Sequence, residues 1–293
     1  MTTLTISIVT YHVDRRVFLE VLESLSRAVA DAIGKGVVQQ TKLIIVDNGD
    51  DEEFLLESIT NLVTFDANVI ANKKNIGFGR AHNLVLKESE SDLHLVLNPD
   101  AILQIDALTI GCRYLRENKE TVMVGPFALK PDGSRAYLCK RYPSILDLLI
   151  RGFLPLWMQS IFNKRLAKYE CHDYPDDRVT KDVLILSGCC MLARTESLTA
   201  AHGFDKDYFL YFEDFHLSLK ITNLGSIDYL PQMRIVHVGG GAAKKGLSHI
   251  MMFCRSAFTF YNANGWKLFS SLAFVLISRE TVASVTCTVT LLF

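Results

Sequence analysis

Acidic side chains follow two apolar, strand-like stretches of this sequence. One stretch ends at Asp47, and the other, at 93–97, runs directly into Asn98-Pro99-Asp100. In open α/β sheets, ligands bind outside the carboxyl ends of the strands. The stiff proline turn would deliver the Asp100 carboxylate to that edge, where it could hold a metal ion. A solvated surface turn is the structural alternative, and the sequence leaves it open.

A second pair of acids closes an aromatic run. Glu213 and Asp214 follow the aromatic residues of 208–212 and open an amphipathic helix that extends to Leu224. An apolar environment raises the pKa of a carboxyl group and costs stability unless partners compensate. An acid of this kind can act as a general base, and we predict that role here. Helix capping is the alternative.

The loop at 72–83 has the composition of an anion-binding turn. Gly77 and Gly79 allow close backbone approach, and Arg80 is a permanent cation. The helix that follows would present its positive N-terminus to an anion. His82 stands where a dinucleotide-binding fingerprint would have its third glycine, so the loop is not that motif.

His237 lies in the apolar stretch at 235–238, which precedes three glycines. A histidine in such a place is usually structural. Its neutral imidazole could complete a divalent-metal site if the fold brings it beside Asp100.

The elements that must position these residues alternate between strand and helix. Residue periodicity predicts strands at 3–10, 42–46, 69–71, 93–97 and 122–124, and helices at 15–32, 52–62, 79–88 and 105–118. This order implies a parallel sheet with helices on both faces. Further along, the patterns predict a hairpin at 127–141, one or two amphipathic helices at 142–174, and strands at 183–186, 227–230 and 235–238. The amphipathic helices could pack on the domain or contact lipid.

Composition limits the class of protein. The 293 residues suit one large domain or two modest ones, and 49% hydrophobic with 22% charged residues is an ordinary globular balance. The net charge of −1 gives no support for nucleic-acid binding. Seven cysteines and no secretory pattern at 1–10 lead us to expect a reduced, cytoplasmic chain whose thiols pack in the core.

Six motifs along the chain occur in the same order as in family 2 glycosyltransferases. As a set, they look most like the motifs of the bacterial rhamnosyltransferases of O-antigen assembly. They are Ile45-Val46-Asp47-Asn48-Gly49, Asn75-Ile76-Gly77-Phe78-Gly79, Leu97-Asn98-Pro99-Asp100, Ser187-Gly188-Cys189-Cys190-Met191-Leu192, Tyr211-Phe212-Glu213-Asp214 and His237. The resemblance covers about residues 3–265. Two departures matter: the family's frequent Asp-x-Asp leaves one carboxylate here, at Asp100, and its usual serine is replaced by Asp50.

The resemblance implies a GT-A fold, that is, a Rossmann-like nucleotide-sugar-binding sheet with acceptor-side elements toward the C-terminus. Residues 1–265 would form the glycosyltransferase domain, with a nucleotide-binding half at 1–126 and an acceptor and catalytic half at 127–265. Residues 266–293 would be an apolar tail. The implied reaction is inverting transfer of L-rhamnose from dTDP-rhamnose to a lipid-linked glycan acceptor.

The resemblance also implies roles for single residues. The residues that would meet the nucleotide are Thr10, Tyr11, Asp47, Asn48, Asn75, Gly77, Arg80 and Asn98. Asp100, with His237, would hold Mg²⁺ or Mn²⁺ on the diphosphate. Asp214 would take the proton of the acceptor hydroxyl, and Glu213 would raise the pKa of its neighbour.

Three other functions remain open at this point. The donor sugar could differ, for example galactofuranose or glucose. A sugar-1-phosphate nucleotidyltransferase would also use a doubly wound domain and a metal, but residues 10–14 lack the glycine- and basic-rich loop expected there. A non-catalytic nucleotide- or glycan-binding module would need no base.

The C-terminal tail at 268–293 is apolar but interrupted by Arg279 and Glu280. Its uncharged runs of 11 and 13 residues are shorter than the roughly 18 to 20 needed to span a bilayer. Upstream, cations and apolar side chains mix in a pattern suited to an anionic membrane surface: Lys244, Lys245, Arg255 and Lys267 with Met251, Met252, Phe253, Phe258 and Phe260. We expect peripheral contact with the inner face of the cytoplasmic membrane; packing of a C-terminal helix on the domain is the alternative.

Overall fold

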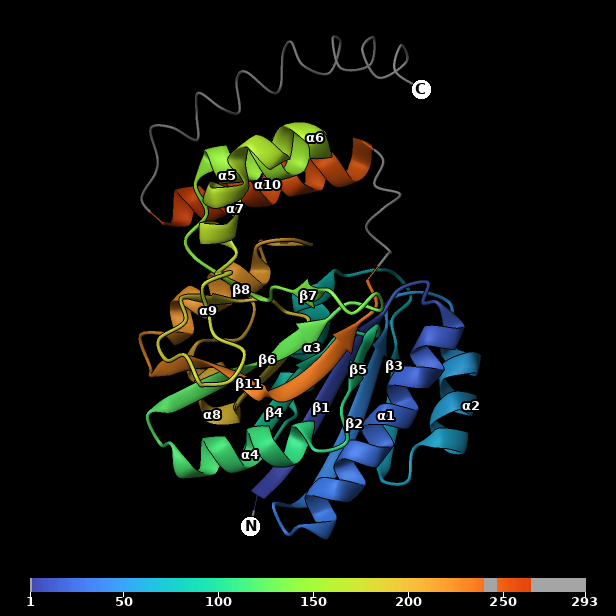
Figure 1. The fold of residues 1–293 in the computed structure, drawn as a ribbon. Coiled ribbons are helices and arrows are strands. Elements are labelled where there is room, and N and C mark those ends of the chain that lie inside the picture. The colour runs from blue at the N-terminus through green and yellow to red at the C-terminus, as the bar shows by residue number, and fades with distance from the viewer. Residues whose placement is uncertain (1, 240–246, 265–293) are drawn as a thin grey trace.

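The computed structural model describes residues 2–239 and 247–264. A nine-stranded mixed sheet lies at the centre of this part of the chain, with helices on both faces and a further helical layer above one edge (Figure 1). The strand order is β3-β2-β1-β4-β10-β6-β11-β5, and β7 pairs with β6.

The first third of the chain forms the parallel part of the sheet, as predicted. The elements are β1 (Thr2–Thr10), α1 (Arg15–Gly34), β2 (Val38–Asp47), α2 (Glu52–Leu62), β3 (Asp66–Ala71), α3 (Phe78–Lys87) and β4 (Leu93–Leu97). β1 pairs in parallel with both β2 and β4. The apolar stripe of α1 is buried against the sheet, and the Asp14 side chain caps this helix by accepting a hydrogen bond from the Val17 N–H. The carboxyl ends of β1, β2 and β4 therefore meet at one edge.

The rest of the chain completes the sheet and adds the helical layer. The elements are β5 (Ala101–Leu103), α4 (Ala107–Glu117), β6 (Thr121–Leu129), β7 (Arg135–Ala136), β8 (Cys139–Lys140), α5 (Ile145–Phe153), α6 (Leu156–Gln159), the 3₁₀ turn η1 (Ser160–Phe162), α7 (Asn163–Tyr169), β9 (Ile185–Leu186), β10 (Cys190–Arg194), α8 (Thr195–Ala200), α9 (Glu213–Ile221), β11 (Ser226–His237) and α10 (Leu247–Ala263). The predicted hairpin turn joins β6 to β7, with Gly133 at φ 81°.

Two predictions about this second part are wrong. The sheet is not parallel throughout, because β10 lies antiparallel between β4 and β6, where no strand was predicted. β11 is one strand rather than two, and its register shifts between Leu230 and Arg234. Pro231 lies in that shift and cannot donate a ladder hydrogen bond, which explains why the sequence pattern breaks there.

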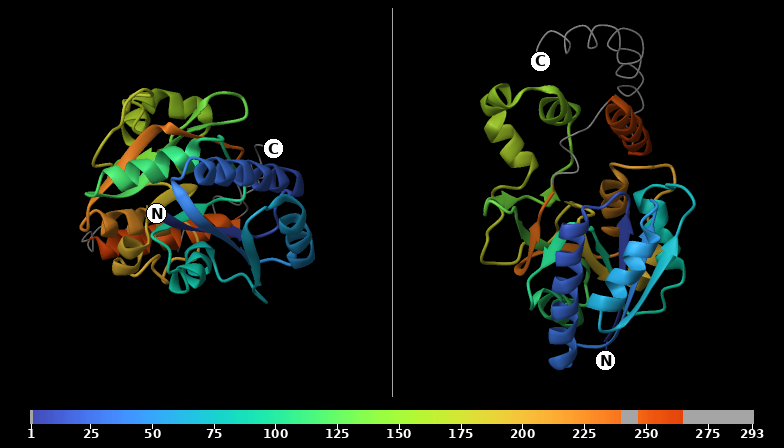
Figure 2. Two further views of the ribbon diagram at one scale, coloured as in Figure 1. Left: turned by 90° about the horizontal axis from the view of Figure 1, so that it is seen from below. Right: turned by 90° about the vertical axis from the view of Figure 1, so that its right-hand side faces the viewer.

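The helical layer stands above the carboxyl edge of the sheet. Figure 2 (right) shows α5, α6 and α7 on one side of this layer and α10 on the other. α5 begins at a capping box in which Ser144 and Asp147 each accept the other's backbone N–H. An aromatic cluster joins α10 to the rest: Leu148, Tyr208, Phe212, Phe260 and Tyr261 are all buried in it.

This packing buries one of the residues predicted to face a membrane and leaves another exposed. Phe260 is fully buried, whereas Met251 is exposed. Lys244, Lys245, Lys267 and the tail at 268–293 lie outside the described residues. Within residues 2–239 and 247–264, no helix is long and apolar enough to cross a bilayer.

Candidate active site

Asp47, at the end of β2, is almost completely buried, with 1% of its surface exposed. Its Oδ1 accepts hydrogen bonds from the Thr10 hydroxyl at 3.2 Å and the Gly49 N–H at 2.8 Å, and its Oδ2 accepts from the Asp51 N–H at 2.9 Å. These donors are mostly backbone groups, so the loop keeps its hydrogen bonds although Asp50 replaces the usual serine. By accepting these hydrogen bonds, the Asp47 carboxylate stabilises the loop that follows it.

The asparagines of this edge are also engaged with the chain itself. Asn48 donates from Nδ2 to the Gly77 carbonyl at 3.2 Å and accepts from Asn72 Nδ2 at 2.8 Å. Asn75 Oδ1 accepts the Gly77 N–H at 2.9 Å. Gly77 has φ 92°, and a Cβ there would lie 2.4 Å from the Phe209 carbonyl oxygen. Glycine is required at this position because another part of the backbone lies against it.

Helix α3 holds the loop that leads to the acidic pair. The Arg80 guanidinium donates to the Lys206 carbonyl at 2.8 and 2.5 Å. The Asn83 side chain donates to the Phe204 carbonyl at 2.7 Å and accepts the Phe204 N–H at 2.9 Å. The residues of the 72–83 loop and its helix thus also anchor the segment at 204–206, a role that their sequence pattern does not indicate.

Two further predicted residues flank the edge. Tyr11 follows β1 with 55% of its surface exposed. Asn98 follows β4, where its N–H donates to the Cys189 carbonyl at 2.9 Å and its carbonyl accepts the Ala101 N–H at 3.2 Å. The turn that presents Asp100 is therefore fixed by backbone hydrogen bonds.

Asp100 and His237 lie side by side, which is the arrangement that a shared cation would require. The antiparallel pairing of β11 with β5 sets His237 opposite Ala101. His237 Nε2 is 3.4 Å from Asp100 Oδ1, a buried oxygen that has no hydrogen-bond partner among the described residues. A carboxylate oxygen without a donor beside an imidazole nitrogen fits a divalent cation. Because no group of three such ligands occurs in the described part of the chain, a cation here would need oxygen ligands from a substrate or water.

Glu213 and Asp214 begin α9, after a strained turn. Tyr211 and Phe212 both have left-handed backbones, with φ 71° and 66°, which non-glycine residues rarely adopt. Asp214 is partly exposed, and its carboxylate accepts the Gly188 and Phe215 N–H groups, each at 2.9 Å. The turn and these two donors fix the direction of the Asp214 carboxylate.

Glu213 lies in a drier environment than Asp214. It is 4% exposed, and its Oε2 has no hydrogen-bond partner within residues 2–239 and 247–264. Burial, together with the adjacent Asp214 charge, raises the pKa of Glu213 to about 8. Burial also raises the pKa of Asp214, against the hydrogen bonds from Gly188 and Phe215. Near pH 7, Glu213 therefore keeps its proton more readily than a solvated carboxyl group would.

A cavity of about 760 Å³ has one member of the candidate metal pair and both acids of α9 in its walls. These residues are His237, Glu213 and Asp214. Lys140 and Arg151, which sequence analysis did not single out, line the same cavity. No motif marks these cations, because they meet the acids only through tertiary packing of β8 and α5.

Comparisons with known proteins agree on a family. The model of the family described as "Glycosyltransferase like family 2" matches residues 2–250. The Rhamnosyltransferase WbbL of Escherichia coli (strain K12) is 24% identical over 174 residues, which are 55% of this chain and 60% of the relative. The N-acetylglucosaminyl-diphospho-decaprenol L-rhamnosyltransferase of Mycobacterium tuberculosis (strain CDC 1551 / Oshkosh) is 26% identical over 212 residues, 66% of each chain. The chain thus spans about two thirds or less of these relatives.

Solved structures resemble the fold. A complex of GalNAc-T7 with UDP, GalNAc and Mn²⁺ has a TM-score of 0.57 and 14% identity, covering 84% of this chain and 45% of that one. S. aureus TarS 1-349 with UDP-GlcNAc also has a TM-score of 0.57 and 14% identity, covering 89% and 67%. The chain has the GT-A fold.

Proposed function

The chain belongs to the glycosyltransferase-like family 2, and we propose that it is an inverting glycosyltransferase that uses a nucleoside-diphosphate sugar. The observation that carries this proposal is the cavity that places Asp214 and His237 on common walls. A base for the acceptor hydroxyl and a metal site for the leaving diphosphate are the two centres that such a reaction needs.

We further propose L-rhamnose, donated by dTDP-rhamnose, as the sugar and a lipid-linked saccharide as the acceptor. Both curated relatives are named rhamnosyltransferases, and the name of the mycobacterial relative specifies a diphospho-decaprenol acceptor. UDP-sugar donors are the alternative, because TarS was solved with UDP-GlcNAc. A galactofuranosyl or glucosyl donor belongs to that alternative.

Asp214 is the proposed base. The Gly188 and Phe215 N–H groups hold its carboxylate, which remains partly exposed, so a free lone pair can accept the proton of the acceptor hydroxyl. The acceptor oxygen attacks the anomeric carbon as that carbon's bond to the diphosphate oxygen breaks, and the bonding electrons leave with the nucleoside diphosphate. A single displacement inverts the anomeric configuration. Burial raises the pKa of Asp214, which favours proton uptake, and the adjacent Asp214 charge helps to keep Glu213 protonated.

Asp100 and His237 are the proposed ligands of Mg²⁺ or Mn²⁺. When bound, the cation would offset the charge that develops on the leaving diphosphate. Tyr11, with 55% of its surface exposed, is a proposed nucleotide contact. The other proposed nucleotide-side residues would contact the donor or support the loops that surround the donor. They are Thr10, Asp47, Asn48, Asn75, Gly77, Arg80 and Asn98.

We also propose that the helical layer touches the membrane in which a lipid-linked acceptor would lie. Trp157 and Ile161 are exposed over more than 70% of their surface, and the exposed cations Lys164 and Lys168 are close to them in sequence. Flotation with anionic liposomes tests this. The full chain should float at low salt, and Trp157→Asp with Ile161→Asp should weaken flotation; equal flotation of both proteins would contradict the proposal.

A transfer assay tests the function itself. The full chain, with Mg²⁺ or Mn²⁺, is incubated with a panel of nucleotide sugars and a lipid-diphosphate-linked saccharide, and products are identified by mass spectrometry. Sugar transfer supports the proposal. Formation of a nucleotide sugar from a sugar 1-phosphate and a nucleoside triphosphate would instead identify a nucleotidyltransferase. Binding without any turnover would identify a non-catalytic module.

A further inference from the structure

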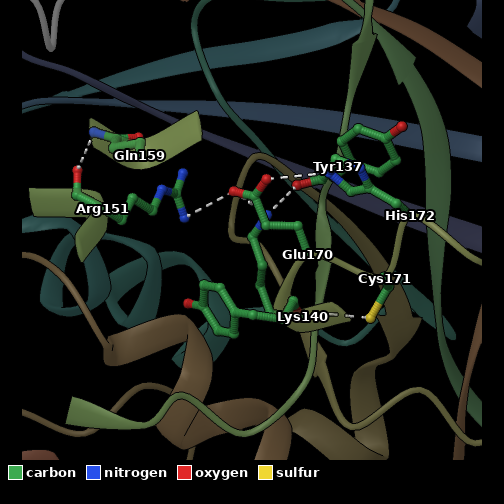
Figure 3. A network of polar contacts seen from close by, with 8 residues as sticks. Tyr137, Lys140, Arg151, Gln159, Glu170, Cys171 and His172 are labelled. Carbon is green, nitrogen blue, oxygen red and sulfur yellow. Dashed lines mark hydrogen bonds and ion pairs between the residues drawn. The ribbon is translucent and has the colours of Figure 1, made fainter. Parts of the chain in front are cut away.

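One glutamate in the cavity wall faces several cationic groups. Lys140 Nζ and Arg151 Nη1 each lie 3.5 Å from Glu170 Oε1, and His172 Nε2 lies 3.2 Å from Oε2 (Figure 3). Burial raises the pKa of Glu170, but the charges of Lys140 and Arg151 outweigh that effect and lower it. A single carboxylate thus faces both an ammonium and a guanidinium, so these three groups together carry one positive charge, and the charge of Lys140 also acts on Asp214.

Lys140 is the buried member of this cluster, with 6% of its surface exposed. Its ammonium donates to the Tyr137 carbonyl at 2.7 Å and to Glu170 at 3.5 Å. Burial lowers its pKa to about 8, so most of it is charged at neutral pH. An ammonium has three donors, and within the described residues these two acceptors are recorded. A buried charge with spare hydrogen-bonding capacity favours an anionic ligand.

Arg151 gives the cluster its accessible side. Half of its side-chain surface is exposed, and Figure 3 shows its guanidinium directed at the Glu170 carboxylate. The planar guanidinium matches phosphate oxygens in geometry and stays charged at all relevant pH values. A phosphate group could therefore bind here without a change in protonation.

The position of the cluster indicates which ligand it serves. Lys140 is close enough to Asp214 to lower the pKa of that carboxyl group. Leu148, Phe212 and Phe253 line the same cavity and supply an apolar wall. One ligand with a hydroxyl near Asp214, an anionic group at Lys140 and an alkyl chain along the apolar wall would match all three features.

We propose that Lys140 and Arg151 bind the diphosphate that links the acceptor saccharide to its lipid. This inference rests on the proposed function and adds a second phosphate site to it, separate from the Asp100–His237 pair that would serve the donor. The two diphosphates would share one cavity, and only the donor's bond to its sugar would break.

Octyl diphosphate is a suitable probe, because it carries the anion and the alkyl chain without a sugar. Its affinity for the full chain is measured by calorimetry in EDTA, where a metal-dependent donor site cannot hold it. Arg151→Gln should weaken binding about ten- to hundredfold, the range for losing charge-assisted hydrogen bonds. Arg151→Lys, which keeps the charge but not the planar geometry, should lose less affinity than Arg151→Gln. Arg113→Gln, the same change at an exposed position of α4 outside the cavity lining, should have no effect.

A second titration separates the acceptor diphosphate from the donor diphosphate. With Mg²⁺ and saturating dTDP, or UDP if the chain binds that nucleotide, octyl diphosphate should bind with nearly unchanged affinity. Displacement by the nucleotide, or equal affinity of wild type and Arg151→Gln, would overturn the inference. Because no turnover is measured, a chain that binds the probe but transfers no sugar would refute the proposed function and not this site.

Discussion

The loop after β2, at the carboxyl edge of the sheet, and the acid-lined cavity differ in how their buried polar groups are satisfied. At the edge, both oxygens of Asp47 accept hydrogen bonds from the Thr10 hydroxyl and nearby backbone donors. In the cavity wall Glu213 Oε2, and in the candidate metal pair Asp100 Oδ1, have no such partner within the described residues. The first arrangement stabilises the fold, and the second costs stability and leaves atoms available to a substrate or metal.

The largest expected effect is a loss of turnover when the proposed base in the cavity is removed. Asp214→Asn keeps the shape and loses the base, so turnover should fall by about two to four orders of magnitude. Steady-state assays measure this change, with donor affinity measured alongside. Asp207→Asn, on the exposed loop just before α9, is the matched control and should leave turnover unchanged. Near-normal rates in Asp214→Asn would remove Asp214 from the mechanism.

The next effect concerns the structural side. Asp47→Ala leaves the Gly49 and Asp51 N–H groups and the Thr10 hydroxyl without their acceptor, and should lower the free energy of unfolding by about 2 to 3 kcal/mol. Urea denaturation measures it. Asp50→Ala, at the neighbouring position, should cost far less. If Asp47→Ala unfolds like wild type and loses only donor affinity, Asp47 belongs to the ligand rather than to the loop.

Asp100→Ala tests the proposed metal site. In Mg²⁺ or Mn²⁺ the variant should bind the nucleoside diphosphate roughly tenfold or more weakly, because one carboxylate and the substrate phosphates share the cation. In EDTA, wild type and variant should bind equally. A difference that persists in EDTA would show that Asp100 acts without a metal, and full wild-type turnover in excess chelator would contradict metal dependence.

The smallest expected effect has the opposite sign. The folded-state pKa of Glu213, about 8, exceeds the ordinary value of 4.5, so the wild type loses stability as pH rises from about 4.5 through 8. Glu213→Gln carries no charge to bury. Relative to wild type, its free energy of unfolding should rise progressively between pH 5 and 8, the window set by the raised pKa of Glu213. A difference that stays constant with pH would show that Glu213 is not protonated in the cavity.

Local sequence patterns were sufficient for the parallel part of the fold and for the places of the acidic residues at element ends, whose catalytic and metal-binding roles stay predictions. Alternating strand and helix periods place β1 to β4, and strand ends mark Asp47 and Asp100. They missed β10, because the small residues 187–189 indicate the end of the strand signal at 183–186, whereas a new strand begins at Cys190. They also missed Lys140, Arg151 and Glu170, which come from three separate segments and meet only in the folded chain. The roles of the nucleotide-side residues stay predictions.

The anomeric configuration of the product tests the central claim most directly. NMR coupling constants of the glycoside formed by the full chain are compared with those of the nucleotide-sugar donor. With Asp214 as a base and no protein nucleophile, a single displacement must give the inverted anomer. Retention of configuration would require a covalent intermediate or a front-face reaction. That result would contradict the proposal that Asp214 acts as the base of a single displacement.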